Sequence, residues 1–314
     1  MREGSRVCPE SVGWASSIDV LPLDKVVERR GGYLAVRSPG NPSHYWGNFL
    51  LFDKPPRHGD ASRWEALFED VFGDEPRVRH RTFGWGLTKT DIGAARSEFV
   101  DRGYNLDENV ALIASAARLQ PHPRQSSQVE VRALDPADGA DVEFWDAVVE
   151  LQVHGRDAGH EEDAYRAFSR QRLDDLCSLF RAGRGAWYVA LDRATGTVVG
   201  SCGIVATAGR GRYQAVDTAP AFRRRGICSR LVVEAARRSA ADYGAARFII
   251  VADSHYHALG LYESLGFERA EHHFGVCRWP PTDTPRDAQP SSSPGAILNT
   301  GAKPPLTTRG RDRR

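Results

Sequence analysis

Residues 216–232 read VDTAPAFRRRGICSRLV, with three arginines directly before a glycine and an apolar run behind it. Apolar residues recur at helical spacing after Gly226, which predicts an amphipathic helix that starts there. The first backbone N–H groups of a helix have no intrahelical partner, so they favour an anion. Glycine lets the backbone approach that anion closely, and arginines add charge-assisted hydrogen bonds. The stretch predicts a phosphate site, with a solvated basic turn as the alternative.

Composition limits what the anion can be. Lys and Arg total 42 and Asp and Glu total 41, so the net charge is +1. A nucleic-acid-binding domain is usually clearly basic, so we expect no nucleic-acid partner and treat the arginine run as a local feature. Hydrophobic residues make up 41% of the chain and charged residues 26%, which is typical of a soluble globular protein.

Cysteine usage and hydropathy indicate the compartment. The five cysteines are far apart and form no C-x-x-C pair, so neither a disulfide framework nor a cysteine zinc site is predicted. The N-terminal residues lack the apolar core of a signal peptide. Apolar runs stay well short of the roughly 18 residues of a membrane span. We therefore expect a cytoplasmic protein without membrane contact.

Two breaks in the pattern divide the 314 residues. Residues 119–128, LQPHPRQSSQ, interrupt two patterned regions and are predicted to be a linker. After Trp279 the chain is rich in Pro, Ser and Thr with a basic end, so residues 280–314 are predicted to be a disordered tail. The expected units are therefore an N-terminal region, 1–118, and a second domain, 129–279.

The second domain alternates strand and helix signals. The pattern predicts the order β-α-α-β-β-β-α-β-α-β-β, with a pair of short strands after Gly266. This order is typical of a mixed α/β layer structure.

A second motif lies about 30 residues after the arginine run. Residues 255–267 read HYHALGLYESLGF. With the first motif, this stretch resembles the GNAT superfamily of acyl-CoA-dependent N-acyltransferases. The first family pattern, R/Q-x-x-G-x-G/A, is matched by Arg223 and Gly226, with Cys228 at the last position. The second, N-x-x-A-x-x-L-Y-x-x-L-G-F, is matched from Ala258 to Phe267, with His255 in place of asparagine.

The resemblance covers about 150 residues and implies a twisted mixed sheet flanked by helices, in which two neighbouring strands splay apart. The pantetheine arm of acetyl-CoA or another acyl-CoA would lie in that gap, bonded to the exposed edge of one strand. Its pyrophosphate would lie at the helix start. The implied cofactor-binding residues are Val216, Thr218, Arg223, Arg224, Arg225, Gly226, Ile227, Cys228, Ser229 and His255.

The resemblance also implies an N-acetyltransferase that attacks the thioester directly with a primary amine of a small molecule, a peptide or a protein. Tyr262 would protonate the leaving sulfur, since a tyrosine of ordinary pKa about 10 is a proton donor at neutral pH. A backbone N–H near Asp217 or Thr218 would hold the oxyanion. Asp217 is the candidate base, with Glu263 or a water chain as alternatives. A non-catalytic acyl-CoA-binding or regulatory module is the alternative function.

Histidine pairs raise the question of a metal. His255 and His257 are two residues apart, and His272 and His273 are adjacent. Neither spacing puts both rings on one helix face, so no metal is predicted.

The N-terminal region shows no Gly-rich phosphate loop. Residues 94–115 nevertheless repeat a helix–Gly–aromatic–strand arrangement, with EFVDRGY matching LYESLGF. We therefore predict a degenerate, GNAT-like half that shapes the substrate site or forms a pseudo-dimer interface, and a homodimer of the chain is a further option. The aromatic stretch 44–52, HYWGNFLLF, is either a buried sheet face or a wall of the acceptor site with Trp46 and Asn48 at its edge.

Overall fold

The structure, a computed structural model, describes residues 10–86, 92–156, 161–256 and 258–279. The predicted disordered tail and His257 lie outside these residues.

Within the described residues, eleven strands form one hydrogen-bonded sheet. The strands are β1 (Val26–Arg30), β2 (Tyr33–Arg37), β3 (Phe49–Phe52), β4 (Arg81–Trp85), β5 (Asn105–Ser115), β6 (Val129–Leu134), β7 (Gly185–Asp192), β8 (Val198–Thr207), β9 (Arg210–Thr218), β10 (Arg247–Asp253) and β11 (Glu268–Arg278). Their order across the sheet is β1-β2-β3-β4-β11-β5-β10-β9-β8-β7-β6. The predicted mixed α/β class is confirmed.

Seven α-helices flank the sheet in the described ranges. They are α1 (Val12–Asp19), α2 (Asp60–Phe72), α3 (Ala94–Asp101), α4 (Val142–Gly155), α5 (Glu162–Arg181), α6 (Ile227–Tyr243) and α7 (Leu259–Ser264). None of these described helices has both the length and the apolarity that a bilayer span requires.

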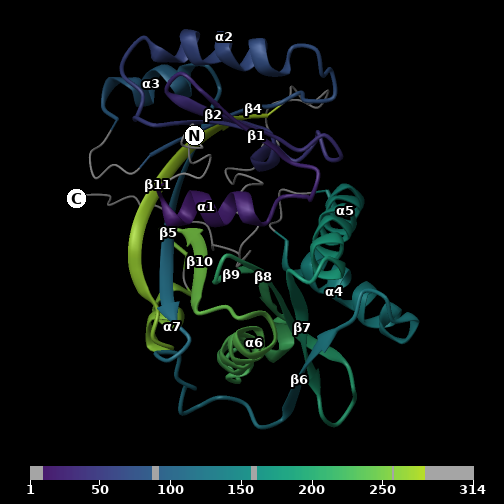
Figure 1. The fold of residues 1–314 in the computed structure, drawn as a ribbon. Coiled ribbons are helices and arrows are strands. Elements are labelled where there is room, and N and C mark those ends of the chain that lie inside the picture. Colours follow the sequence, from purple (N-terminus) through teal and green to yellow (C-terminus); the bar gives the residue numbers. More distant parts are fainter. Residues whose placement is uncertain (1–9, 87–91, 157–160, 257, 280–314) are drawn as a thin grey trace, which may run out of the picture.

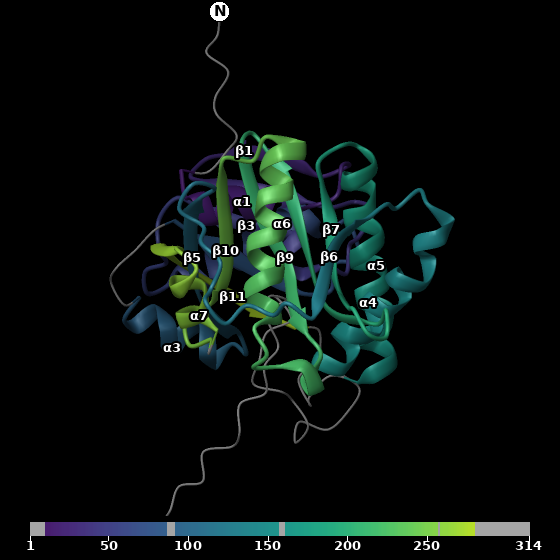
Figure 2. The ribbon, with the colours of Figure 1, turned by 90° about the horizontal axis from the view of Figure 1, so that it is seen from below.

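Helix α6 follows directly from its sequence. Gly226 precedes it with φ 75° and Gly244 ends it with φ 66°, both in the left-handed region that favours glycine. Its apolar face is buried against β6 to β9, with Leu231 and Val232 fully enclosed. Figure 2 shows α6 lying across one face of the sheet, while α4 and α5 cover the other.

The chain repeats one arrangement twice. In each half a parallel strand pair flanks a long helix, β3‖β4 around α2 and β9‖β10 around α6. A short helix, a glycine of positive φ and a buried aromatic residue then lead into an 11-residue strand. The amide of Tyr104 donates to Phe99 O in one half, and that of Phe267 donates to Tyr262 O in the other. The predicted helix–Gly–aromatic–strand repeat is confirmed.

The two long strands are exchanged between the halves. β11, from the end of the described chain, lies between β4 and β5, and β5 lies between β11 and β10. Figure 1 shows β11 and β5 side by side along one side of the molecule, running between α7 and the strands β2 and β4. One hydrogen-bonded sheet therefore contains strands from both sides of the expected linker, residues 119–128. The division of the chain into two separate units stays a prediction.

Two sequence-based expectations need correction or addition. The region after Gly266 was predicted as two short strands, but it forms the single strand β11. Pairing with both β4 and β5 keeps this strand continuous. The N-terminal elements α1 and β1 had no corresponding prediction. Glu271 of β11 accepts hydrogen bonds from the amides of Val12 and Gly13, which anchors the start of α1.

Candidate functional site

The parallel strands β9 and β10 separate along their length. They pair only at their first residues, where Arg247, Phe248 and Ile249 face residues 210–212. From Ile250 onward β10 pairs with β5 alone, and β9 keeps only β8 as a neighbour. The divergence expected from the family resemblance is therefore present, and it leaves one edge of β9 without a strand partner from residue 213 to residue 218.

A bulge distorts β9 at the point of divergence. Ala215 has φ 41°, in the left-handed region, and the register with β8 shifts between Ser201 and Gly203. A bulge breaks the regular alternation of the strand and re-aims its backbone groups. The predicted contact residues Val216, Asp217 and Thr218 directly follow it. Val216 is buried, and the other two are partly exposed.

The loop between β9 and α6 adopts the turn that an anion site needs. Arg224 and Gly226 both have positive φ, 64° and 75°. Alternating left-handed positions turn successive amides toward one concave side. Among the described residues, no side-chain acceptor is hydrogen-bonded to the amides of residues 224–229. The start of α6 is thus available for an anion.

The three arginines of the loop are exposed, as a phosphate site would require. The side chain of Arg223 donates to the carbonyl of Thr218 at 3.3 Å, and Arg225 lies over the ring of Phe222. Of the other predicted residues of this loop, Ile227 and Ser229 are buried and Cys228 is half-buried. Their side chains pack inward, so any contact with an anion would use their backbone amides.

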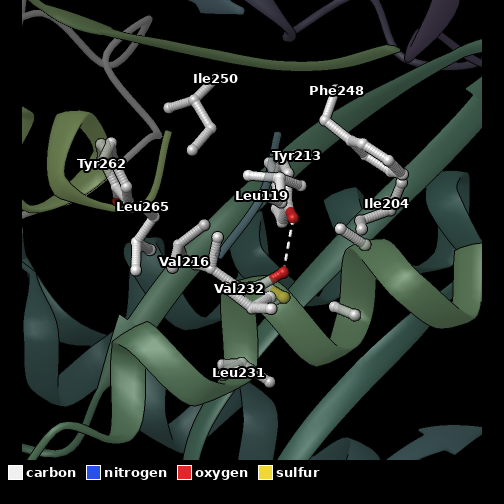
Figure 3. Packing of buried hydrophobic residues seen from close by; sticks show 14 of the residues in the cluster. Leu119, Ile204, Tyr213, Val216, Leu231, Val232, Phe248, Ile250, Tyr262 and Leu265 are labelled. Atoms are coloured by element: carbon white, nitrogen blue, oxygen red, sulfur yellow. Dashed lines mark hydrogen bonds between the residues drawn. The ribbon is translucent and has the colours of Figure 1, made fainter. Parts of the chain in front are cut away.

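The predicted acid is buried in the hydrophobic cluster that both diverging strands share. Tyr262 of α7 is 1% exposed and belongs to the same buried cluster as Val216 of β9 and Ile250 of β10 (Figure 3). Its ring packs edge-on against Phe267, with 6.2 Å between centroids. In the same cluster the Tyr213 hydroxyl donates to Val232 O at 2.6 Å, which ties β9 to α6.

The electrostatics of Asp217 suit proton transfer. Burial raises the pKa of its carboxyl to about 7, while the neighbouring Arg223 guanidinium acts in the opposite direction. A group with a pKa near the working pH can both accept and release a proton. Burial also raises the pKa of the Cys228 thiol to about 12, with Asp217 adding to the effect, so this thiol is neutral near pH 7.

The remaining predicted residues lie further from the bulge. His255 is exposed after the end of β10, where its amide donates to Asp253 Oδ1 at 2.7 Å. The alternative base Glu263 is exposed and accepts from Arg269 at 2.6 Å. That ion pair holds Glu263 on the outer side of α7, so Asp217 is the better candidate.

The corresponding region of the N-terminal half is closed. β3 and β4 stay paired to their last residues, and the amide of Gly86 donates to Phe52 O just beyond. Gly59 precedes α2 with φ 88°, as Gly226 precedes α6, but its amide is bonded to the Glu98 carboxylate at 2.7 Å. A carboxylate thus already occupies the place where a phosphate would bind. Only the second half offers an open arrangement among the described residues.

The aromatic stretch before β3 is mostly a buried sheet face. All four residues of β3 are buried, and Trp46 packs against Trp14 and Phe49. Asn48 is 2% exposed, and its side chain bonds to Ser38 N, Asn41 O and His44 O. Asn48 therefore holds the loop before it in place.

The histidine pairs do not converge. His272 lies 3.6 Å from Glu108 at the surface, whereas His273 is buried on the other side of β11 against Trp14. No group of three or more His, Cys, Asp or Glu side chains in the described part is arranged to hold a metal ion.

Comparison with known proteins identifies this arrangement. The acetyltransferase (GNAT) family matches residues 145–267, which include α5 to α7 and the diverging strands. This segment belongs to the GNAT family. No curated protein matches the chain at a significant level.

Solved structures show the same fold over most of the chain. A conserved protein of unknown function from Staphylococcus epidermidis is 13% identical, with a TM-score of 0.69 over 82% of this chain and 96% of its own. A GCN5-related N-acetyltransferase from Kribbella flavida is 16% identical, with a TM-score of 0.55 over 85% and 96%. A tandem GNAT protein from the clavulanic acid biosynthesis pathway is 15% identical, with a TM-score of 0.53 over 90% and 92%. The GNAT fold, including its tandem form, is therefore shown, and family and fold together support acyl transfer in general.

The sequence motifs gave no indication of one buried polar cluster in this tandem GNAT fold. Arg172 of α5 and Arg212 of β9 are buried beside Gln214, next to the bulge. A signal was present in the sequence, since Arg172 stands four residues from both Phe168 and Leu176 on the apolar face of its helix.

Proposed function

We propose that this chain is an N-acetyltransferase that transfers an acetyl group from acetyl-CoA to a primary amine. The observation that carries the proposal is the separation of β9 from β10 next to the Ala215 bulge, together with a helix start at Gly226 that no side chain caps, after the loop that follows β9. β9 thus offers an edge without a strand partner for the pantetheine amides, and the start of α6 offers backbone donors for the pyrophosphate.

Each chemical demand of the reaction has a candidate group. The amine nitrogen attacks the thioester carbon, a C–N bond forms, and the C–S bond breaks. Asp217 accepts the proton that the amine loses, which its pKa of about 7 supports. A backbone N–H after the bulge, near Asp217 or Thr218, stabilises the oxyanion, a contribution of roughly 3–4 kcal/mol in comparable sites. Tyr262 protonates the departing CoA thiolate.

Most of the proposed acetyl-CoA-binding residues lie on the end of β9, the loop after it and the start of α6. Arg223, Arg224 and Arg225 contribute charge beside the amides of the α6 start. Ile227, Cys228 and Ser229 contribute backbone N–H groups, while Val216 and Thr218 contribute the strand edge. His255 lies beyond the end of β10 and is the least supported member of this set. No residue is assigned to a metal, and the absence of a nucleic-acid partner and the homodimer both stay predictions.

The test combines binding with turnover. Isothermal calorimetry with acetyl-CoA measures binding, and thiol release across a panel of amines measures transfer. Binding together with amine-dependent thiol release supports the proposal. Binding without turnover for any amine would instead support a non-catalytic acyl-CoA-binding or regulatory module. Absence of binding contradicts both.

A further inference from the structure

Two arginine side chains are buried where the two halves meet. Arg172 and Arg212 are 9% and 4% exposed. Arg172 donates to Val20 O at 3.1 Å and to Gln214 Oε1 at 3.0 Å, which are both neutral acceptors. Arg212 donates to Tyr213 O at 3.4 Å, and its buried Nε has no hydrogen-bond partner among the described residues. Buried charges are normally paired, so this arrangement needs an explanation.

The nearby carboxylates do not neutralise the pair. Asp19 is bonded to Arg210 at 2.7 Å, and Asp175 accepts from Asn41 at 2.8 Å. Within the described ranges neither buried guanidinium forms an ion pair with a carboxylate.

Both arginines nevertheless keep their charge near neutral pH. Burial lowers the pKa of Arg172 to about 10, against the pull of Asp175. Burial lowers the pKa of Arg212 to about 9, and the neighbouring Arg172 lowers it further, against the pull of Asp19. Two positive charges are therefore buried close enough for Arg172 to lower the pKa of Arg212.

Two neutral histidines complete the cluster. His44 and His273 are 9% and 3% exposed, and the Nδ1 atom of each is buried without a partner in the described part of the chain. Burial lowers the pKa of both, with Arg172 adding to the effect at His44 and Arg212 at His273. Each imidazole thus stays neutral, so neither histidine adds to the buried positive charge.

The cluster lies beside the proposed reaction centre. Gln214, which accepts from Arg172, directly precedes the bulge residue Ala215. A strand rises about 3.3 Å per residue, so the anchor and the proposed oxyanion donor are separated by only a few residues of β9. Arg212 and Gln214 are two residues apart and share one face of the strand, opposite to Tyr213, which bonds to α6.

We propose that Arg172 and Arg212 bind the carboxylate of the acceptor, so that the acceptor is a small amine that also carries a carboxylate. The planar guanidinium fork matches a carboxylate, and the arriving negative charge would offset part of the positive charge of the pair. This inference rests on the proposed function, because it names the substrate class of the same site.

Matched ligand pairs test the inference on the unaltered protein. L-Lysine is compared with cadaverine and L-ornithine with putrescine, by calorimetry without acetyl-CoA and by thiol release with it. O-Phosphoethanolamine is the arm for a phosphate anion. We expect each carboxylate-bearing member to bind and to exceed its partner in kcat/KM by at least about 100-fold, as sites built for a polar group discriminate. Equal values within the pairs, or a preference for the phosphate, would overturn the inference.

Variants then assign the residues. Arg172→Met and Arg212→Met should remove the preference for the carboxylate member while calorimetric affinity for acetyl-CoA is kept. Arg170→Met is the matched control, because Arg170 lies on the exposed side of α5. A retained preference in both folded variants would contradict the assignment. If neither variant folds, the ligand pairs on the unaltered protein still decide.

The two proposals fail separately. If amines are acetylated with no preference for the carboxylate-bearing member of each pair, the N-acetyltransferase function is supported and this inference is wrong. Absence of acetyl-CoA binding sinks the proposed function, while calorimetry with L-lysine alone still tests the anion site.

Discussion

The carbonyl oxygen of Arg124 lies against the α-carbon of Gly226, so the segment that joins the two halves runs alongside the residue before α6. A Cβ at Gly226 would overlap that oxygen and come within 2.9 Å of Arg124 C and Gln125 Cα. The amide of Ser126 donates to Gly226 O, and Arg230 donates back to Ser126 O. Gly266 is covered in the same way by the carbonyl of Arg118, at 2.5 Å from an added Cβ. Both motif glycines thus make room for the joining segment.

This contact predicts the effect of Gly226→Ala on stability. A non-glycine residue in the left-handed region costs about 1–2 kcal/mol, and overlap with fixed backbone adds about 1–3 kcal/mol. Gly59→Ala is the matched control, because Gly59 also precedes a helix with φ 88° but an added Cβ there meets nothing within 4 Å. Chemical denaturation should show a clearly larger loss for Gly226→Ala. Equal losses would mean that the segment moves aside easily.

The tandem repeat gives a natural comparison for Tyr262. Phe99 occupies the corresponding place in the N-terminal half and packs edge-on against Tyr104, as Tyr262 does against Phe267. Tyr262→Phe should therefore be accommodated by the fold. We expect kcat to fall by roughly 100-fold or more, as for loss of a general acid, with little change in acetyl-CoA affinity by calorimetry. A parallel loss of affinity and stability would indicate a structural role for the hydroxyl.

The exchanged strands predict that the second half does not fold alone. In a fragment of residues 129–279, β10 loses its partner β5, and β11 loses both β4 and β5. Unpaired strand edges promote aggregation. We expect an insoluble or unfolded fragment, and recovery of a folded complex when residues 1–128 are co-expressed. A soluble fragment with native near-ultraviolet circular dichroism would show that the exchange is dispensable.

Part of this architecture could be predicted from the sequence, and part of it could not. The loop at Gly226 and the motif at Tyr262 were predictable because each consists of particular residue types at fixed local spacing. The exchange of β5 and β11 was not, because a strand has the same alternating pattern whichever neighbour it pairs with. Arg212 looked like an ordinary strand residue, and the alternating pattern of its strand does not show that its side chain is buried. The sequence therefore predicts the local motifs but not the contacts between the two halves.

Asp217 makes a prediction about the pH dependence of turnover. Its pKa is raised to about 7, mainly by burial. A base acts in its deprotonated form, so kcat/KM should rise with pH up to about 7 and then level off. Asp217→Asn should lower turnover and abolish this limb of the profile. Persistence of the same limb in Asp217→Asn would assign the ionisation to another group, such as the amine itself.

The pH dependence of the free energy of unfolding tests the raised pKa of Asp217 independently. Because its pKa is higher in the folded protein than in the unfolded chain, where it is about 3.9, the folded state binds the proton more tightly between these two values. The contribution of Asp217 to the free energy of unfolding is therefore fully present below about pH 4 and is lost as pH rises toward 7. Denaturation of Asp217→Asn at pH 5 and pH 8 should show a smaller decline over this range than the unaltered protein does. An identical decline in both would mean that the carboxyl titrates normally, and the case for Asp217 as the base would fail with it.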